Sequence, residues 1–324
     1  MIRVLMGLLG VLVLLAGGAA VYGTRIYDAP GPLPGPRAVV VPRGGLEQVA
    51  SALAAEGVVD SALTLRLAAL ATRGEGALRA GELEFPAGAS LRQVLGVMRT
   101  ARAVQHRLTV PEGLTAAQVA ALLERAPALE GPVVLPAEGR MLPDTYLYDR
   151  GTTRAAVVER GVRAMDKALA AAWEARAKDL PLTTPDQALT LASIVERETG
   201  KAEERPHVAA VFLNRLQRGM KLQSDPTVVY GASGGLGVLD HGITRAELDR
   251  DDPYNTYRIA GLPPGPIAMP GAASLRAVTQ PVQSDDLFFV ADGTGGHVFA
   301  RTNEEHLRNV AKWREIERVR AARP

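Results

Sequence analysis

The sequence predicts an α+β fold in which one apolar helix precedes two folded domains. Its 324 residues are enough for two sizeable cores, and 47% hydrophobic and 22% charged residues are typical of a globular protein. An uncharged run lies near the N-terminus, a proline-rich segment follows it, and strand-like and helix-like patterns then alternate. These three features indicate an anchor or leader, a linker and a mixed α+β body.

Composition excludes several classes of function. The 37 basic and 35 acidic residues give a net charge of +2, which argues against general electrostatic attraction to nucleic acid. There is no cysteine, so disulfides, thiol nucleophiles and cysteine-zinc sites are excluded. The histidines are scattered without the spacing of a helical metal site, and we expect neither a metal nor another cofactor. They are His106, His207, His241, His297 and His306.

The N-terminal run Val4–Tyr22 carries no charged residue. At 1.5 Å per residue it spans roughly 28 Å, close to the thickness of the hydrocarbon layer. It is longer than the apolar part of a usual signal peptide, although its small residues leave a cleaved signal open. Arg3 precedes the run, whereas Arg25 is offset by Asp28. We therefore expect residues 1–27 to be a cytoplasmic tip and a single transmembrane anchor in the cytoplasmic membrane, with the rest of the chain outside.

Residues 28–37, DAPGPLPGPR, place proline at alternate positions. Such a segment can form neither a helix nor a central strand. We expect a semi-extended linker that holds the next domain away from the bilayer.

A pattern of Pro-x-Gly followed by Gln-Val occurs three times, in VPRGGLEQV, FPAGASLRQV and VPEGLTAAQV. Each copy predicts a strand end, a turn and an amphipathic helix, with Ser90 or Thr115 able to cap its helix. Such modules resemble LysM glycan-binding domains, so residues 38–104 are interpreted as a LysM-like domain. Generic αβ turn chemistry explains the pattern equally well. The third copy opens the second domain, residues 105–324.

The second domain shows the patterns of helices, a polar turn and a hairpin. Apolar residues at helical spacing predict helices over residues 153–175 and 206–218. Another helix begins with Thr184 as its N-cap and ends at Gly200. A turn is expected over Gln223–Thr227, and DLFFVADGTGGHVFAR predicts a β-hairpin.

The helix that ends in LTLASIVERETG carries two carboxylates. Glu196 continues the apolar stripe, whereas Glu198 points to a different face, so the two do not form a side-by-side pair. Burial raises the pKa of a carboxyl group and keeps it protonated, as a general acid requires. The alternative is that Glu196 pairs with an arginine such as Arg197 or Arg215, or is solvated.

A series of ordered motifs resembles the YceG-like family of bacterial endolytic murein transglycosylases. They are LASIVERET, VFLNRL, GMKLQSDPTVVYG, YNTY, GLPPGPI and GGHVF, and the resemblance covers nearly the whole chain. It implies a YceG-like catalytic domain that cleaves the β-1,4 bond between N-acetylmuramic acid and N-acetylglucosamine without water. The products would be 1,6-anhydro ends on nascent peptidoglycan strands, whose elongation would stop. Implied partners are glycan strands, peptidoglycan polymerases and penicillin-binding proteins.

The resemblance also implies roles for single residues. It places the catalytic glutamate at the first glutamate of SIVERET, Glu196, acting as acid and then base. Expected substrate contacts are Gln223, Asp225, Tyr254, Asn255 and Tyr257. Expected supporting residues are Glu198, Asn214 and Arg215, of which the last two could equally hold two helices together. Met269 and Leu307 stand where the family often has asparagine, and they cast doubt on local loop contacts.

Two rival functions remain open at this stage. A hydrolase of the same glycan would use a second carboxyl group, for which Asp225 is the candidate, and would leave reducing ends. A non-catalytic, membrane-tethered scaffold that binds the cell wall would tolerate the substitution Glu196→Gln.

Overall fold

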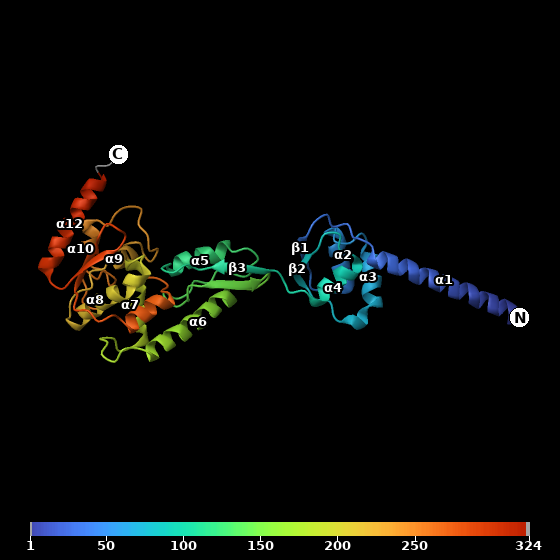
Figure 1. The fold of residues 1–324 in the computed structure, drawn as a ribbon, viewed down its shortest axis with the longest axis horizontal. Helices are drawn as coiled ribbons and strands as arrows, with labels where there is room; N and C mark the ends of the chain where they lie inside the picture. Colours follow the sequence, from blue (N-terminus) through green and yellow to red (C-terminus); the bar gives the residue numbers. More distant parts are fainter. Residues whose placement is uncertain (1, 322–324) are drawn as a thin grey trace. The chain divides into compact units, whose positions relative to one another are not determined.

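The computed structural model describes residues 2–321, which form two compact units (Figure 1). Unit 1 extends to His106 and includes Tyr148–Gly151, and unit 2 comprises Arg107–Leu147 and the residues from Thr152 onward. The described residues contain helices and three two-stranded sheets, which confirms the mixed α+β class.

Helix α1 (Ile2–Asp28) is the apolar N-terminal helix that the sequence predicts. Its segment Met6–Asp28 is the single stretch of the described chain that is long and apolar enough to cross a membrane. A signal sequence would have the same properties, so the helix fits an anchor without excluding the alternative.

Unit 1 packs three short helices against a two-stranded sheet. Strands β1 (Arg37–Val41) and β2 (Gly81–Phe85) are antiparallel, with Arg37 opposite Phe85. A common core is formed by Val39, Leu53, Leu65, Phe85, Leu95 and Met98. The helices are α2 (Leu46–Ala55), α3 (Ala62–Ala71) and α4 (Leu91–Thr100), and a short 3-10 turn, η1 (Arg73–Glu75), follows α3. The assignment of this unit to LysM-like domains stays a prediction.

All three Pro-x-Gly copies fold as a strand, a turn and a helix. They are β1 with α2, β2 with α4, and β3 (Gln105–Thr109) with α5 (Ala116–Arg125). The predicted caps at Ser90 and Thr115 are confirmed, because each side chain accepts a hydrogen bond from the backbone N–H three residues later. The side-chain oxygens of Gln93 and Gln118 accept a hydrogen bond from the backbone N–H of the respective cap residue, which completes a capping box in both copies.

The proline-rich segment is extended, as predicted, but it is packed against unit 1. Leu33 is buried in the core of unit 1. The backbone N–H of Gly31 donates to the carbonyl of Gly88, and the N–H of Gly88 donates to the carbonyl of Leu33. An apolar side chain and two backbone bonds thus fasten the segment to unit 1, and its role as a linker that holds unit 1 away from a bilayer stays a prediction.

Strands β3 and β4 (Thr145–Asp149) pair with each other. Tyr146 and Tyr148 are buried on β4 while their neighbours are exposed, as on a half-buried strand.

Unit 2 is built around helix α7 (Pro185–Glu198), which packs against α6 (Arg154–Glu174), α8 (Arg205–Gln217) and α11 (Ala272–Thr279). Every residue from Ala188 to Glu196 is buried, so α7 is covered on all sides. The predicted hairpin is confirmed as β5 (Phe288–Ala291) and β6 (His297–Ala300). The remaining elements are η2 (Ala202–Glu204), α9 (Asp225–Ala232), α10 (Arg245–Asp249) and α12 (Asn303–Ala321).

One expected element differs in the structure. The predicted turn Gln223–Thr227 instead opens helix α9, with Ser224 at the N-cap position and Pro226 in the first turn. Serine followed by Asp-Pro is a helix start, a signal that the turn interpretation missed. The predicted ends of α7 are confirmed, because Thr184 is its N-cap and Gly200 directly follows its C-cap, Thr199.

The packing of Leu33 can be tested by removing its side chain. Leu33→Ala removes a buried side chain and should lower the local unfolding free energy of unit 1 by about 2–3 kcal/mol. Native-state hydrogen exchange, resolved over residues 81–100 by mass spectrometry, measures this change. The control is Val40→Ala, on an exposed side of β1, which should have little effect. Equal exchange in both variants would mean that the segment is a free spacer.

Candidate active site

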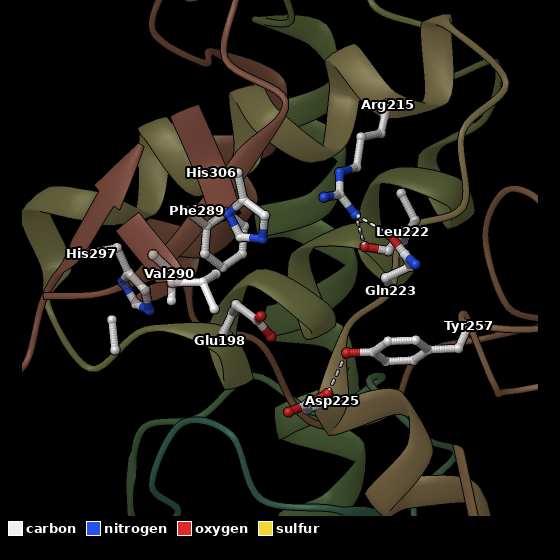
Figure 2. Close-up of a pocket in the computed structure, with 12 residues that line it drawn as sticks. Glu198, Arg215, Leu222, Gln223, Asp225, Tyr257, Phe289, Val290, His297 and His306 are labelled. Carbon is white, nitrogen blue, oxygen red and sulfur yellow. Dashed lines mark hydrogen bonds between the residues drawn. The ribbon is translucent and has the colours of Figure 1, made fainter. Parts of the chain in front are cut away.

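Unit 2 contains a cavity of about 440 Å³ at the end of helix α7 (Figure 2). The Glu198 carboxylate points into it, between the hairpin residues on one side and the segment that leads into α9 on the other. The lining residues come from α7, α8, α9, α12, the hairpin and two loops. They are Glu198, Arg215, Leu222, Gln223, Asp225, Tyr257, Phe289, Val290, Ala291, His297, His306 and Val310.

Glu198 is the last residue of α7 and the carboxyl group at the centre of this wall. Its Oε2 accepts a hydrogen bond from Ser224 Oγ at 3.0 Å. Burial raises the pKa of Glu198 to about 7, the Ser224 bond opposes this rise, and the charge of Asp225 adds to it. A carboxyl group with this pKa can both donate and accept a proton near neutral pH, as acid-base catalysis requires.

Asp225 and Tyr257 form a hydrogen-bonded pair on the same wall. The Tyr257 hydroxyl donates to Asp225 Oδ1 at 2.6 Å. Burial raises the pKa of Tyr257, so its hydroxyl keeps its proton and remains a donor. Helix α9 carries Asp225 at its N-terminus, where the helix dipole favours a negative charge.

Gln223 has a strained backbone at the edge of the cavity. Its φ of 52° lies in the left-handed region, which non-glycine residues rarely adopt. The backbone N–H donates to the Thr256 carbonyl at 3.1 Å, and the side-chain Oε1 accepts from Arg215 Nη1 at 3.4 Å. Strain of this kind persists where surrounding contacts hold a residue for a functional purpose.

Arg215 and Asn214 of α8 fix the segments that frame the cavity. The buried Arg215 guanidinium donates to the carbonyls of Leu287 at 2.6 Å and Leu222 at 2.7 Å. Asn214 Nδ2 donates to the carbonyls of Ser284 and Asp286. Both residues therefore join α8 to the segment that leads into strand β5, and these bonds do not reach α7.

Glu196 lies behind the cavity rather than on its wall. Its side chain is 3% exposed, and Oε2 accepts hydrogen bonds from Gly271 N at 2.9 Å and Ser274 Oγ at 2.8 Å. Oε1 accepts from Arg205 Nη2 at 2.7 Å. Burial raises the pKa of Glu196, and these three donors act against that rise. An arginine pairing as considered from the sequence therefore exists, with Arg205 of α8 as the partner. The bonds from Gly271 and Ser274 fasten α7 to the start of α11.

Asn255 and Tyr254 do not face the cavity. Asn255 is 2% exposed, and its Nδ2 donates to three backbone carbonyls, those of Glu247, Leu248 and Arg250. Its Oδ1 accepts from the N–H of Tyr257, so the side chain shapes the loop, and its role as a substrate contact stays a prediction. Tyr254 packs on Tyr230 with ring centres 4.8 Å apart. Within YNTY, Tyr257 alone lines the cavity, because the buried asparagine turns its neighbours in different directions.

The two departures from the family pattern lie outside the cavity wall. Met269 is fully buried, its N–H donates to the Leu114 carbonyl, and its own carbonyl accepts from Gly113. Leu307 lies exposed on α12. The hairpin and α12 form one side of the cavity, and sequence reasoning named no site residue in either of them. The motif GGHVF contains His297, whose Nδ1 lies 2.7 Å from Glu204 Oε2, and that polar residue was the available signal.

The model of the YceG-like family matches residues 39–312 of this chain. The chain belongs to the YceG-like family. It is 38% identical over 198 residues to a relative from Streptococcus pneumoniae serotype 2 that is named endolytic murein transglycosylase. The matched region covers 59% of this chain and 35% of that protein. A relative of the same name from Bacillus subtilis strain 168 is 34% identical over 178 residues, or 55% of this chain and 48% of that protein.

A solved structure supports the same family. The 2.6 Å crystal structure of a putative yceG-like protein from Listeria monocytogenes is 29% identical and superposes with a TM-score of 0.53. It covers 84% of this chain and 98% of that one. The match to the two named relatives spans only a third to a half of their length, so their names alone do not carry an activity over to this YceG-like chain.

The raised pKa of Glu198 predicts how the stability of this YceG-like protein depends on pH. The folded chain keeps the proton up to about pH 7, whereas the unfolded chain releases it near 4.5, so stability falls as pH rises through this window. Glu198→Gln does not titrate and should be more stable than wild type by about 2 kcal/mol at pH 8, after allowance for partial exposure. The difference should vanish at pH 4.

Urea unfolding at pH 4, 6 and 8 measures this effect. The matched control is Glu304→Gln, whose parent side chain is 84% exposed in the first turn of α12 and which should follow wild type at every pH. A stability difference for Glu198→Gln that stays constant across the three pH values would contradict the assignment.

Proposed function

We propose that this chain is a membrane-anchored endolytic lytic transglycosylase that cleaves the N-acetylmuramic acid to N-acetylglucosamine β-1,4 bond of nascent peptidoglycan. The observation that carries the proposal is the Glu198 carboxyl group, which has a pKa of about 7 and points into the cavity of unit 2. The names of the S. pneumoniae and B. subtilis relatives supply the substrate class.

We assign the acid to Glu198, whereas the motif comparison pointed to Glu196. Three donors, one of them a guanidinium, occupy the two oxygens of Glu196, and its side chain is almost fully covered. These donors oppose the rise in the pKa of Glu196 that burial causes, and they leave little of its side chain exposed to a substrate. Glu198 accepts one hydrogen bond, from the Ser224 hydroxyl, and its carboxylate points into the cavity. Glu196 then acts as the residue that positions the end of α7.

A single carboxyl group can catalyse the reaction, acting first as an acid and then as a base. Protonated Glu198 donates its proton to the glycosidic oxygen as the bond to C1 of the muramyl residue breaks, so the leaving strand takes the bonding electrons and ends in a hydroxyl group. The Glu198 carboxylate then accepts the proton of the muramyl C6 hydroxyl while that oxygen bonds to C1. The product is a 1,6-anhydro end, water is not consumed, and Glu198 is again protonated.

Asp225 supports the charge that develops in this reaction. An oxocarbenium-like transition state carries positive charge at C1, and a nearby carboxylate stabilises it. Asp225 is close enough to Glu198 to raise its pKa, and Tyr257 holds its orientation. The same residue would activate water in the rival hydrolase, so the chemistry of the products separates the two functions.

The location follows from helix α1. As a single-pass anchor in the cytoplasmic membrane it would place both units on the extracytoplasmic side, where nascent glycan strands lie. Peptidoglycan polymerases, including penicillin-binding proteins, supply such strands and are the proposed neighbours. Cleavage beside them would terminate strand elongation.

The first test is the product chemistry of the full chain in detergent micelles with uncrosslinked glycan polymer. Mass spectrometry should find 1,6-anhydromuramyl ends with wild type, and Glu198→Gln should lower their rate of formation by at least about 10²-fold. Glu196→Gln should retain the product at a reduced rate, because its role is to hold α7 in place. Glu203→Gln, at an exposed carboxylate in η2, is the matched control.

Each other outcome points elsewhere. Reducing ends would shift the case to hydrolysis and to Asp225. Loss of activity in folded Glu196→Gln with full activity in Glu198→Gln would return the acid to Glu196. A folded wild type that cleaves nothing would favour the wall-binding scaffold.

Substitution of Gln223 by glycine should raise the stability of the fold and weaken substrate binding. Gln223→Gly relieves the left-handed strain and should stabilise the fold by about 1 kcal/mol, while the loss of its amide at the cavity should raise KM severalfold. Gln223→Ala removes the same amide but keeps the strain, so it should share the KM effect without the gain in stability. Thermal unfolding and steady-state kinetics of both variants separate the two effects, and unchanged KM in both would exclude Gln223 from substrate binding.

A further inference from the structure

Helix α3 of unit 1 exposes a row of leucines. Leu63, Leu67 and Leu70 are 60%, 58% and 56% exposed, and their spacing places them on one face of the helix. The opposite face packs in the core of unit 1 through Leu65 and Ala69. The helix is thus apolar on both sides, which is unusual for a helix that contacts only water on its outer face.

This row borders an apolar groove that α3 shares with the end of α1. The groove has a volume of about 460 Å³, and both helices belong to the same compact unit. Figure 1 shows α3 at the end of unit 1 from which α1 emerges. The groove is lined by Ala20, Gly23, Thr24, Ile26, Tyr27, Thr64, Leu67, Ala68, Ala71, Thr72 and Leu91.

The position of the groove along α1 sets its depth in a bilayer. The uncharged part of α1 ends at Thr24, and Arg25 follows it. The groove extends from Ala20 to Tyr27 and therefore straddles the point where the apolar run ends. In a spanning helix that point lies where hydrocarbon meets lipid headgroups. A helix held beside it lies at the same level.

The charges around α3 are mixed, because exposed Asp60 precedes the helix and Glu75 follows Arg73. Helix α3 contains no acidic residue, and its one charged side chain, Arg66, lies 3.6 Å from Glu47 in a partly exposed ion pair. Arg73 follows the helix and is exposed, and Arg25 lies in the last turn of α1. Basic residues beside an apolar helical face are typical of helices that lie in a membrane interface.

We propose that α3 is an interfacial membrane-binding helix, whose Leu63, Leu67 and Leu70 insert among the lipids that surround α1 and whose groove is filled by their acyl chains. The proposal rests on the membrane anchor of the proposed function. Lipid is the occupant because the wall of the groove includes α1 residues from Ala20 to Tyr27, so the groove adjoins the apolar run of that helix, and the segment after α1 is packed on unit 1 through Leu33. Unit 1 is therefore a membrane-surface module.

The cysteine-free sequence allows single labels to test this on the full chain. The variants Leu14→Cys in α1, Leu67→Cys in α3 and Glu84→Cys on the exposed side of β2 each carry an environment-sensitive fluorophore. The protein is reconstituted in vesicles of phosphatidylethanolamine and phosphatidylglycerol, with and without nitroxide-labelled lipids. All three sites are exposed, so the labels leave the core intact.

Labels at positions 14 and 67 should be quenched severalfold more strongly by the nitroxide lipids than the label at position 84. If the label at position 14 is strongly quenched but the label at position 67 is quenched as weakly as the label at position 84, the inference is overturned and the anchor stands. Weak quenching at 14 removes the anchor and the inference with it. If position 67 instead shows coupling between labelled copies that fades on dilution in lipid, a second protein chain covers the face, and the inference is overturned.

Discussion

Unit 2 depends on one constraint, which is that helix α7 is buried on every side yet carries polar side chains in its last two turns. Each of those groups must find a partner, because an unpaired buried polar group is costly. Ser193 Oγ accepts from Ile267 N, and Glu196 accepts from Gly271 and Ser274. These bonds fix the loop before α11 to the helix. The rigid end of α7 is then what presents Glu198 to the cavity.

The outline of the fold was predictable from local patterns. The capping residues Ser90 and Thr115 act on backbone groups three residues away, and both predictions are confirmed. The segment Gln223–Thr227 was assigned to the wrong element because its polar residues suit a turn and a helix start alike. Only the length of the apolar pattern that follows distinguishes the two.

The site was harder to predict because its walls come from distant parts of the chain. The apolar stripe predicts correctly that Glu196 is buried, but burial does not say whether a group meets a cavity or a partner. Arg205, Gly271 and Ser274 settle that question, and no local pattern connects them to α7. Glu198 gains its raised pKa from the α9 segment and the hairpin around it. The sequence could show only that the two carboxylates diverge.

The proline-rich segment shows how the same composition serves two structures. Alternate prolines keep a chain extended, and this favours a spacer in solution. They also lack an N–H group and have already lost conformational freedom, so such a segment can pack without unsatisfied donors and at a small entropic cost. Leu33 is its one large apolar side chain, and it is the residue that enters the core. With that side chain buried and two backbone hydrogen bonds to Gly88, the segment that follows α1 packs on unit 1.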